Sequence, residues 1–198
     1  MSLVPIVSLL AVAIVLLMAG CQTGPAPAER TDAVSLRGKP LTLLGPQLKV
    51  GDLAPDFSAV ANDMATYRFS NRSGAVWVLA SVPSLDTPVC SIETRRFNEE
   101  ASKLPGVKIL TISMDLPFAQ ARWCGAEGVK NIQTLSDSRD RAFGTAYGLR
   151  IKENGLLARA VFVINKTGRI AYIQIVPELS QEPDYDSALA AARKAAGE

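Results

Sequence analysis

Two nearly continuous apolar runs, at residues 75–82 (AVWVLASV) and 107–113 (VKILTIS), stand out in the hydrophobic pattern of the chain. Runs of this kind are typical of central strands that are covered on both faces. Between them, residues 89–104 repeat apolar side chains at helical spacing, which predicts a helix. The side chains on its apolar side are Ile92, Phe97, Ala101 and Leu104.

Helical and strand-like segments continue to alternate toward the C-terminus. Two of the predicted helices have an aspartate that can cap the start and a glycine that can end the helix. The predicted elements are a helix at about 117–124 with Asp115 as its cap and Gly125 as its end, a strand at 131–135, a helix capped by Asp137 through Tyr147, a hairpin of strands 160–164 and 170–176, and an amphipathic helix from Asp184.

A second hairpin is predicted ahead of the first central strand, where short apolar segments at 35–36 and 40–44 flank the turn RGK at 37–39. Strands alternating with helices indicate an α/β domain with a central mixed β-sheet flanked by helices. The order suits a thioredoxin-like fold with an N-terminal β-hairpin. The pattern alone leaves several other α/β topologies open.

The N-terminal segment carries no charged side chain up to residue 28, and a run of apolar residues there ends in small ones. This pattern is typical of an export signal, so residues 1–20 are predicted to be a signal peptide. The ending LMAGC also resembles a bacterial lipobox, which implies that Cys21 carries the lipid of a mature lipoprotein. Residues 21–34 would be a lipid-anchored flexible tether, and residues 35–198 would form the folded domain.

This interpretation predicts an exported, membrane-anchored protein that faces the periplasm or the cell exterior. Two alternatives remain open. An uncleaved helix at 3–20 would have Arg30, Arg37 and Lys39 on its C-terminal side only, and the positive-inside rule would then hold the domain in the cytoplasm. The other alternative is a start codon assigned to the wrong position.

Length and composition exclude several classes of function. The 198 residues suffice for one globular domain and hardly for two. Charged residues make up 20% and the net charge is +2, which gives no support for a nucleic-acid partner. The chain has no histidine, which excludes Ser-His-Asp and Cys-His catalysis and His-ligated metal sites unless a partner supplies the ring. Its three cysteines are too few for a four-cysteine zinc site, and no metal or cofactor is expected.

The thiol at Cys90 is the first candidate for chemistry, because it follows a buried strand and opens a helix. A cysteine in the first helical turn lies among unpaired backbone N–H groups at the positive end of the dipole, which favours a thiolate. Thr87 offers a hydroxyl within one turn, while Pro83 and Pro88 stiffen the loop. Glu93, one turn further on, is interpreted as a structural carboxylate. A buried, unreactive cysteine is the alternative interpretation.

At this loop the sequence resembles a known family. Pro83, Thr87 and Cys90 match the PxxxTxxC motif of peroxiredoxins. The wider sequence looks like their thiol peroxidase subfamily, and the similarity extends over about residues 35–197. The segments that carry it are SLDTPVCSIETRRFNEEA (84–101), DLPFAQARWCGAEG (115–128), LLARAVFVI (156–164) and EPDYDSAL (182–189).

The resemblance implies a role for each matching residue. Cys90 would be the peroxidatic cysteine and Cys124 the resolving cysteine, and the two would form an intrachain disulfide. Thr87 would hydrogen-bond the thiolate and the peroxide, Pro83 would shield the pocket, and Arg159 would lie near the thiolate. A guanidinium suits that place because it stays charged and offers several donors. The resemblance further implies a homodimer and a thioredoxin-like dithiol reductant.

The implied reaction reduces hydrogen peroxide and organic hydroperoxides. The Cys90 thiolate would attack the peroxide to give a sulfenic acid, Cys124 would convert the sulfenic acid to a disulfide, and a dithiol would restore both thiols. A disulfide needs Cα atoms within about 7 Å, so local unwinding near residues 90 and 124 is also expected.

Two other classes of protein stay open at this point. A general thiol-disulfide oxidoreductase normally uses Cys-x-x-Cys, but Ser91, Ile92 and Glu93 follow Cys90. A non-catalytic exported domain could instead hold Cys90 and Cys124 as a permanent structural disulfide, which oxidising compartments favour.

Overall fold

The computed structural model describes residues 27–197 of the chain. The predicted signal peptide and Cys21 lie outside these residues. Within the described part, no helix has both the length and the apolar character needed to cross a membrane.

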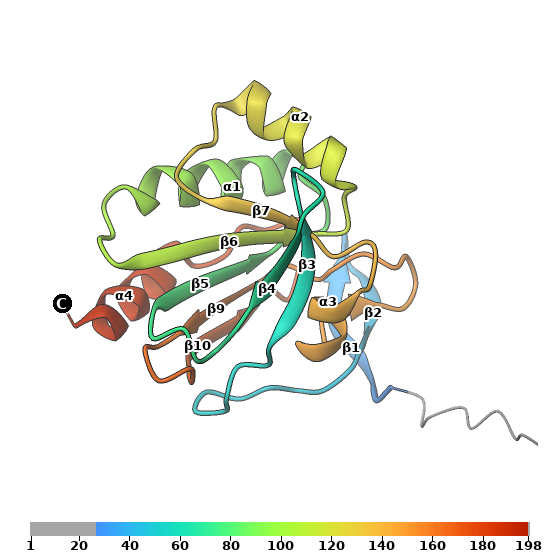
Figure 1. Ribbon diagram of the computed structural model, residues 1–198. Coiled ribbons are helices and arrows are strands. Elements are labelled where there is room, and N and C mark those ends of the chain that lie inside the picture. The colour runs from blue at the N-terminus through green and yellow to red at the C-terminus, as the bar shows by residue number, and fades with distance from the viewer. Residues whose placement is uncertain (1–26, 198) are drawn as a thin grey trace, which may run out of the picture.

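Seven strands form the central sheet in the order β10-β9-β5-β6-β7-β3-β4 (Figure 1). The pairs β5–β6 and β6–β7 are parallel, and the other neighbours are antiparallel. This mixed sheet with flanking helices confirms the predicted fold class. In chain order its strands are β3 (Phe57–Ala61), β4 (Thr66–Phe69), β5 (Val76–Ser81), β6 (Val107–Ser113), β7 (Gln133–Ser136), β9 (Ala160–Ile164) and β10 (Ile170–Ile175).

The central strand β5 explains why the sheet is covered on both faces. All six of its residues are buried, and successive side chains of a strand point to opposite faces. Val76, Val78 and Ala80 pack into one apolar cluster, whereas Trp77 and Leu79 pack into another. The continuous apolar run therefore serves two cores.

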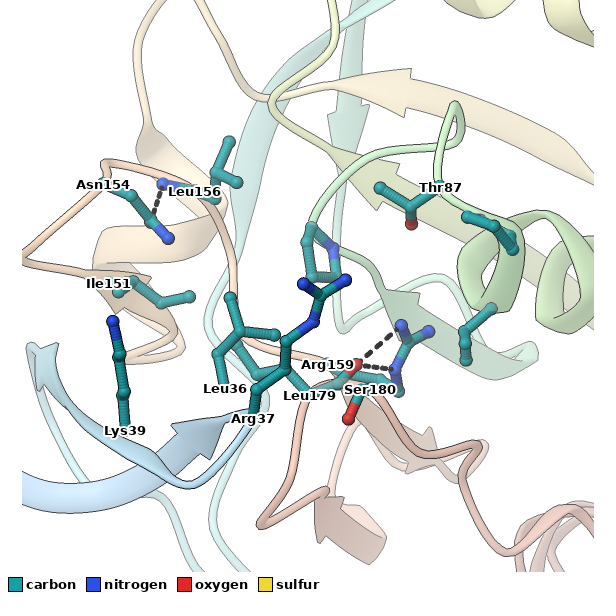
Figure 2. Close-up of a pocket in the computed structure, with 13 residues that line it drawn as sticks. Leu36, Arg37, Lys39, Thr87, Ile151, Asn154, Leu156, Arg159, Leu179 and Ser180 are labelled. Atoms are coloured by element: carbon teal, nitrogen blue, oxygen red, sulfur yellow. Dashed lines mark hydrogen bonds between the residues drawn. The ribbon is translucent and has the colours of Figure 1, made fainter.

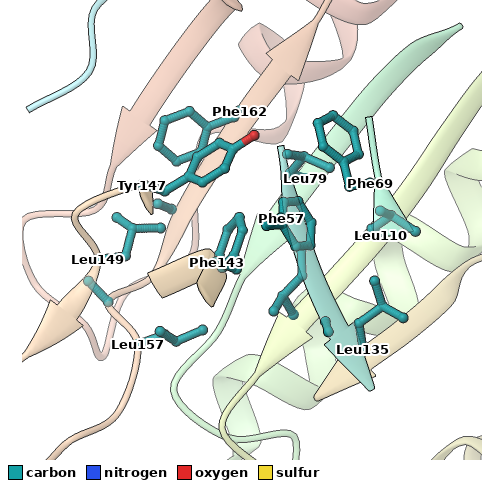
Figure 3. Packing of buried hydrophobic residues seen from close by; sticks show 14 of the residues in the cluster. Phe57, Phe69, Leu79, Leu110, Leu135, Phe143, Tyr147, Leu149, Leu157 and Phe162 are labelled. Carbon is teal, nitrogen blue, oxygen red and sulfur yellow. The ribbon is translucent and has the colours of Figure 1, made fainter. Parts of the chain in front are cut away.

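Helices α1 (Pro88–Ala101) and α4 (Tyr185–Ala196) cover one face through side chains such as Phe97 and Leu189. The short helix α3 (Ala142–Ala146) lies at the other face, which carries an aromatic cluster (Figure 3). There the ring centroids of Phe143 and Tyr147 are 4.6 Å apart. Helix α2 (Pro117–Glu127) lies beside β7 near one end of the sheet (Figure 1).

The predicted N-terminal hairpin is present as β1 (Glu29–Leu36) and β2 (Lys39–Leu44), which with β8 (Arg150–Ile151) form a separate antiparallel sheet. Its two turn residues have left-handed φ values of 52° at Arg37 and 75° at Gly38, as a tight two-residue hairpin requires. Strand β1 begins at Glu29, so residues 29–34 belong to this strand instead of a tether, and Glu29, Arg30 and Val34 pair with β2. Val34 anchors them, since it is 3% exposed.

Two predicted helix signals are wrong. Helix α2 continues past Gly125 to Glu127 and ends at Gly128, which has a left-handed φ of 67°. Asp115 does not cap this helix, because Leu116 occupies the N-cap position. Gly125 is tolerated within the helix because a glycine there costs only about 1 kcal/mol. Cys124 therefore lies within α2 and not at its end.

The other predicted elements are confirmed with shifted ends. The helix predicted after Asp137 is shorter, because α3 begins at Ala142 with Arg141 at the N-cap position. The Asp137 carboxylate still accepts hydrogen bonds from the first-turn amides of Phe143 and Gly144. Asp184 caps α4 by accepting from the Ser187 amide. The hairpin of β3 and β4 was not predicted from the sequence.

Candidate active site

Cys90 lies in the first turn of α1, directly after the loop that leaves β5. It is fully buried, and it packs with Val82 and Leu85 in a small apolar cluster against which Trp123 rests. Thr87 precedes the helix at the N-cap position, and Pro88 occupies the first turn. Proline suits that position because the first-turn amides have no partner within the helix. The predicted placement of Cys90 at a helix N-terminus is confirmed.

Arg159 provides the polar contact of the Cys90 sulfur. Its Nη2 lies 3.2 Å from Cys90 Sγ, and the side chain is 1% exposed although it is charged. The guanidinium also donates to the carbonyl of Leu179 from Nε and Nη2, at 3.2 and 3.0 Å. Figure 2 shows these two bonds, which fix the plane of the guanidinium. Nη2 on this group is the atom that contacts the Cys90 sulfur.

Glu93 completes the charge balance of this buried group, since its Oε2 accepts from Arg159 Nη1. Burial raises the pKa of Glu93 to about 7, against the downward pull of Arg159. Burial alone would lower the pKa of Arg159, but the interactions with Glu93 and Cys90 together outweigh burial, so the pKa of Arg159 is raised. Glu93 thus positions the arginine, which goes beyond the structural role predicted for it. Its place three residues after Cys90 puts both on one face of α1.

The loop before Cys90 is tied to the sheet by Asp115. The Asp115 carboxylate accepts from Ser84 Oγ at 2.7 Å, from the Leu85 amide at 2.8 Å and from Ser113 Oγ at 2.7 Å. The residue predicted to cap α2 instead holds the cysteine loop against the end of β6.

Thr87 and Pro83 line the pocket beside Cys90, as expected from their positions. The Thr87 hydroxyl donates to the Ser84 carbonyl at 2.9 Å, and no hydrogen bond within residues 27–197 joins it to the Cys90 sulfur. The pocket has a volume of about 550 Å³, and most of its wall is apolar. Cys90 follows directly after three lining residues, 87–89, and it contacts a fourth, Arg159.

Cys124 lies on α2 in different surroundings. It is partly exposed in a separate cavity of about 270 Å³. Its Sγ lies 3.3 Å from Thr134 Oγ1 and 3.9 Å from Asn62 Nδ2, and Asn62 also donates to Thr134. Cys90 and Cys124 are both free thiols. The structure thus brings Arg159, Thr87 and Pro83 to Cys90, but it leaves Cys124 at another site.

Comparison with known proteins identifies the family of the chain. The Redoxin family model matches residues 49–189. The chain is 50% identical over 163 residues to the thiol peroxidase of Halalkalibacterium halodurans, covering 82% of this chain and 98% of the relative. It is 52% identical over 162 residues to that of Listeria monocytogenes, with the same coverage.

The chain belongs to the redoxin family, as one of its thiol peroxidases. A solved peroxiredoxin-like protein from Aquifex aeolicus is similar in structure, with a TM-score of 0.79 and 45% identity over 84% of this chain and 97% of that one. The expected function is therefore confirmed as that of a thiol-dependent peroxidase of the peroxiredoxin type.

Three functional contacts of this thiol peroxidase were not predicted. The sequence predicts only a structural role for Glu93 and a helix cap at Asp115, and it gives no sign of the Leu179 carbonyl. Only the contact of Glu93 could be predicted from the sequence, because Glu93 lies one helical turn after Cys90 and so on the same face of the helix. The other two depend on chain segments that meet only in the folded protein.

Proposed function

We propose that Cys90 is the peroxidatic residue of this enzyme and that Arg159 activates it. The observation that carries the proposal is the 3.2 Å contact between Arg159 Nη2 and Cys90 Sγ in a fully buried place. A buried guanidinium stabilises a thiolate strongly because no water screens the pair. The amides at the N-terminus of α1 act in the same direction.

In the first step the Cys90 thiolate attacks the terminal oxygen of the peroxide. The S–O bond forms while the O–O bond breaks, the sulfur becomes a sulfenic acid, and the departing oxygen takes a proton to leave as water or an alcohol. Arg159 can donate to the developing negative charge. The Thr87 hydroxyl, now bound to Ser84, turns to the peroxide, and Pro83 keeps water from the pocket.

In the second step Cys124 attacks the sulfenic sulfur and releases water, which gives the Cys90–Cys124 disulfide. The two thiols occupy separate sites, and a disulfide requires Cα atoms within about 7 Å. The first turn of α1 and the part of α2 that carries Cys124 therefore unwind during the cycle. A thioredoxin-like dithiol then restores both thiols by exchange.

The test is peroxide consumption by the full-length protein with excess dithiol, beside Cys90→Ser and Cys124→Ser. Cys90→Ser should abolish turnover, and Cys124→Ser should accumulate a sulfenic acid that a dimedone-type reagent traps. Turnover that survives in Cys90→Ser would contradict its role. A disulfide that no dithiol reduces would instead support a structural bond.

The lipid anchor is a further part of the proposal. The sequence LMAGC at residues 17–21 supports acylation of Cys21, which would hold the enzyme at a membrane on the side of the periplasm or cell exterior. A labelled fatty acid should enter the wild-type protein and not Cys21→Ala, and Cys21→Ala should leave the membrane fraction. Incorporation of the labelled fatty acid into Cys21→Ala would contradict acylation at Cys21.

The last part of the proposed function is that two copies of the chain form a homodimer. Leu116 and Phe118, at the start of α2, are 61% and 58% exposed, and contact with a second copy of the chain would remove their apolar surface from water. Sedimentation should give a dimer for the wild type and a monomer for Leu116→Glu with Phe118→Glu. A monomeric wild type would contradict the proposal.

A further inference from the structure

The guanidinium of Arg159 is oriented by a segment that lies outside the cysteine loop. This segment, residues 176–180, follows β10, and its Val176 amide donates to the Arg159 carbonyl at 2.9 Å. Further along it, the Leu179 carbonyl accepts from Arg159 Nε and Nη2 at 3.2 and 3.0 Å (Figure 2). The same Nη2 lies 3.2 Å from Cys90 Sγ. A shift of the Leu179 carbonyl would therefore move the atom that contacts the sulfur.

The N-terminal hairpin holds this segment from the other side. Ser35, near the end of β1, forms a parallel bridge with Glu178. The Ser35 amide donates to the Pro177 carbonyl at 2.6 Å, and the Ser35 carbonyl accepts from the Leu179 amide at 2.8 Å. The residues on both sides of Glu178 are thus bound to one residue of the hairpin.

The Glu178 carboxylate adds hydrogen bonds to both partners where they meet. From the hairpin it accepts from the amides of Arg37 and Gly38 at 2.9 and 3.1 Å, and from Ser35 Oγ at 3.0 Å. From its own segment it accepts from the Ser180 amide and hydroxyl at 3.1 and 2.6 Å. The Ser180 hydroxyl and then the two hairpin amides hold the pKa of Glu178 well below its usual range. Hydrogen bonds to such a charged acceptor are roughly twice as strong as neutral ones.

Glu153 offers a matched comparison on the same hairpin. Its two carboxylate oxygens each lie 3.0 Å from the Thr42 amide of β2, which donates to them. Within residues 27–197, no hydrogen bond joins Glu153 to the segment after β10. Of these two carboxylates, only Glu178 joins the hairpin to that segment.

We propose that Glu178 is a positioning residue of the active site. Its carboxylate fastens the hairpin turn to residues 177–180 and so holds the Leu179 carbonyl in place. That carbonyl in turn keeps the Arg159 guanidinium against the Cys90 sulfur. The inference rests on the proposed function, because it assumes that Arg159 activates Cys90.

The test compares Glu178→Gln with Glu153→Gln in the full-length protein. Glutamine offers one acceptor oxygen in place of two and turns N–H donors toward amides that also donate, so the hairpin should loosen from residues 177–180. We expect stopped flow to show a peroxide step about tenfold slower in Glu178→Gln. A misplacement of about 1 Å can cost roughly a hundredfold, but the bond of Arg159 to Glu93 remains. Glu153→Gln should keep the wild-type rate.

A second readout separates positioning from loss of stability and needs no peroxide. The ultraviolet absorbance of the Cys90 thiolate is measured in each protein as the difference from its Cys90→Ser form. It should develop at higher pH in Glu178→Gln than in the wild type or Glu153→Gln, whereas a variant that is only less stable keeps the wild-type profile while it is folded. If Glu178→Gln does not fold, Ser35→Ala removes a single bond to this carboxylate and should shift the profile in the same direction by less.

A wild-type rate and thiolate profile in Glu178→Gln would overturn the proposal, and so would equal changes in Glu153→Gln. Where Glu178→Gln does not fold, an unshifted profile in Ser35→Ala would overturn it. A wild-type protein whose Cys90 is not oxidised by peroxide would contradict the proposed function instead. The thiolate profiles would still decide the role of Glu178 in that case.

Discussion

The two thiols of the described chain lie in opposite environments. Cys90 is fully buried and contacts a buried guanidinium that is itself paired with a carboxylate. Cys124 is partly exposed and contacts a neutral hydroxyl and a neutral amide. The charge around Cys90 suits the peroxidatic role that we propose for it, in which the thiol reacts as an anion. The weak neutral contacts around Cys124 suit the proposed resolving role, in which this thiol leaves its place to reach the Cys90 sulfur.

The largest effect should come from replacing the guanidinium group that distinguishes the Cys90 site from the Cys124 site. Arg159→Lys keeps a cation but cannot hold Cys90, Glu93 and the Leu179 carbonyl together. We expect the rate of the peroxide step to fall by about 10²–10³, as for the loss of one donor to a developing anion. Stopped-flow oxidation measures this step, and alkylation of Cys124 in a Cys90→Ser background should be unchanged.

Variants at Arg159 need a control for folding, because breaking a buried ion pair by removing one partner lowers the free energy of unfolding by about 3–5 kcal/mol. The double variant Arg159→Gln with Glu93→Gln removes both charges and avoids a lone buried carboxylate. It should fold and react as slowly as Arg159→Lys. A rate for either variant within threefold of the wild type would remove the basis of the comparison.

The second prediction concerns the pH dependence of stability. Of the two thiol sites, only the Cys90 site should contribute to this dependence, because the Glu93 carboxylate belongs to it. The pKa of Glu93 is about 7 in the folded chain against an ordinary 4.5. Between these values the folded state binds more protons than the unfolded state, so the free energy of unfolding falls as pH rises from about 4.5 through 7. Glu93 should contribute about 2–3 kcal/mol to this fall.

Denaturation of the wild type and Glu93→Gln across this pH range measures the effect. The pKa of Asp137 is also raised by burial, to about 6, and Asp137 remains in both proteins. The difference between their pH slopes therefore isolates Glu93. Parallel slopes would mean that Glu93 does not titrate in this window.

The smallest effect should come from the Cys124 side. Thr134→Val removes the hydroxyl 3.3 Å from Cys124 Sγ while keeping the shape of the side chain. A net hydrogen bond contributes about 1 kcal/mol, so the disulfide should form several-fold faster and Cys90 should resist overoxidation better. Quenched-flow and mass spectrometry measure both. Thr134→Ser, which keeps the hydroxyl, should match the wild type, and a slower peroxide step in Thr134→Val would contradict the separation of the sites.

Local signals were sufficient to place Cys90, because an apolar strand, a proline-bounded loop and a helix follow one another along the chain. They failed for Asp115, whose partners Ser84 and Leu85 lie about thirty residues earlier. They failed for Gly125, because a glycine ends a helix only where the backbone turns left-handed, as at Gly128. The strands β3 and β4 were missed because they are short and their apolar alternation is weak.

The active site shows the same limit. The motif supplied Pro83, Thr87 and Cys90, and the resemblance added Arg159. The pairing of Arg159 with Glu93 joins residues 66 positions apart, and no periodicity along the chain indicates such a contact. The bond between Thr87 and Ser84 is likewise a matter of side-chain rotation, which residue type alone does not determine.

The contact of Trp123 with the cluster of Val82, Leu85 and Cys90 gives the enzyme an optical signal of its own. Trp123 directly precedes Cys124 in the chain, but its indole packs beside the other thiol, Cys90. The proposed unwinding that joins the two sulfurs should therefore move the indole away from these apolar side chains. The second tryptophan, Trp77, stays in β5 with its N–H on Ser73. Under the proposed cycle, the fluorescence of Trp123 should change as the disulfide forms, whereas the fluorescence of Trp77 should stay constant within the same molecule.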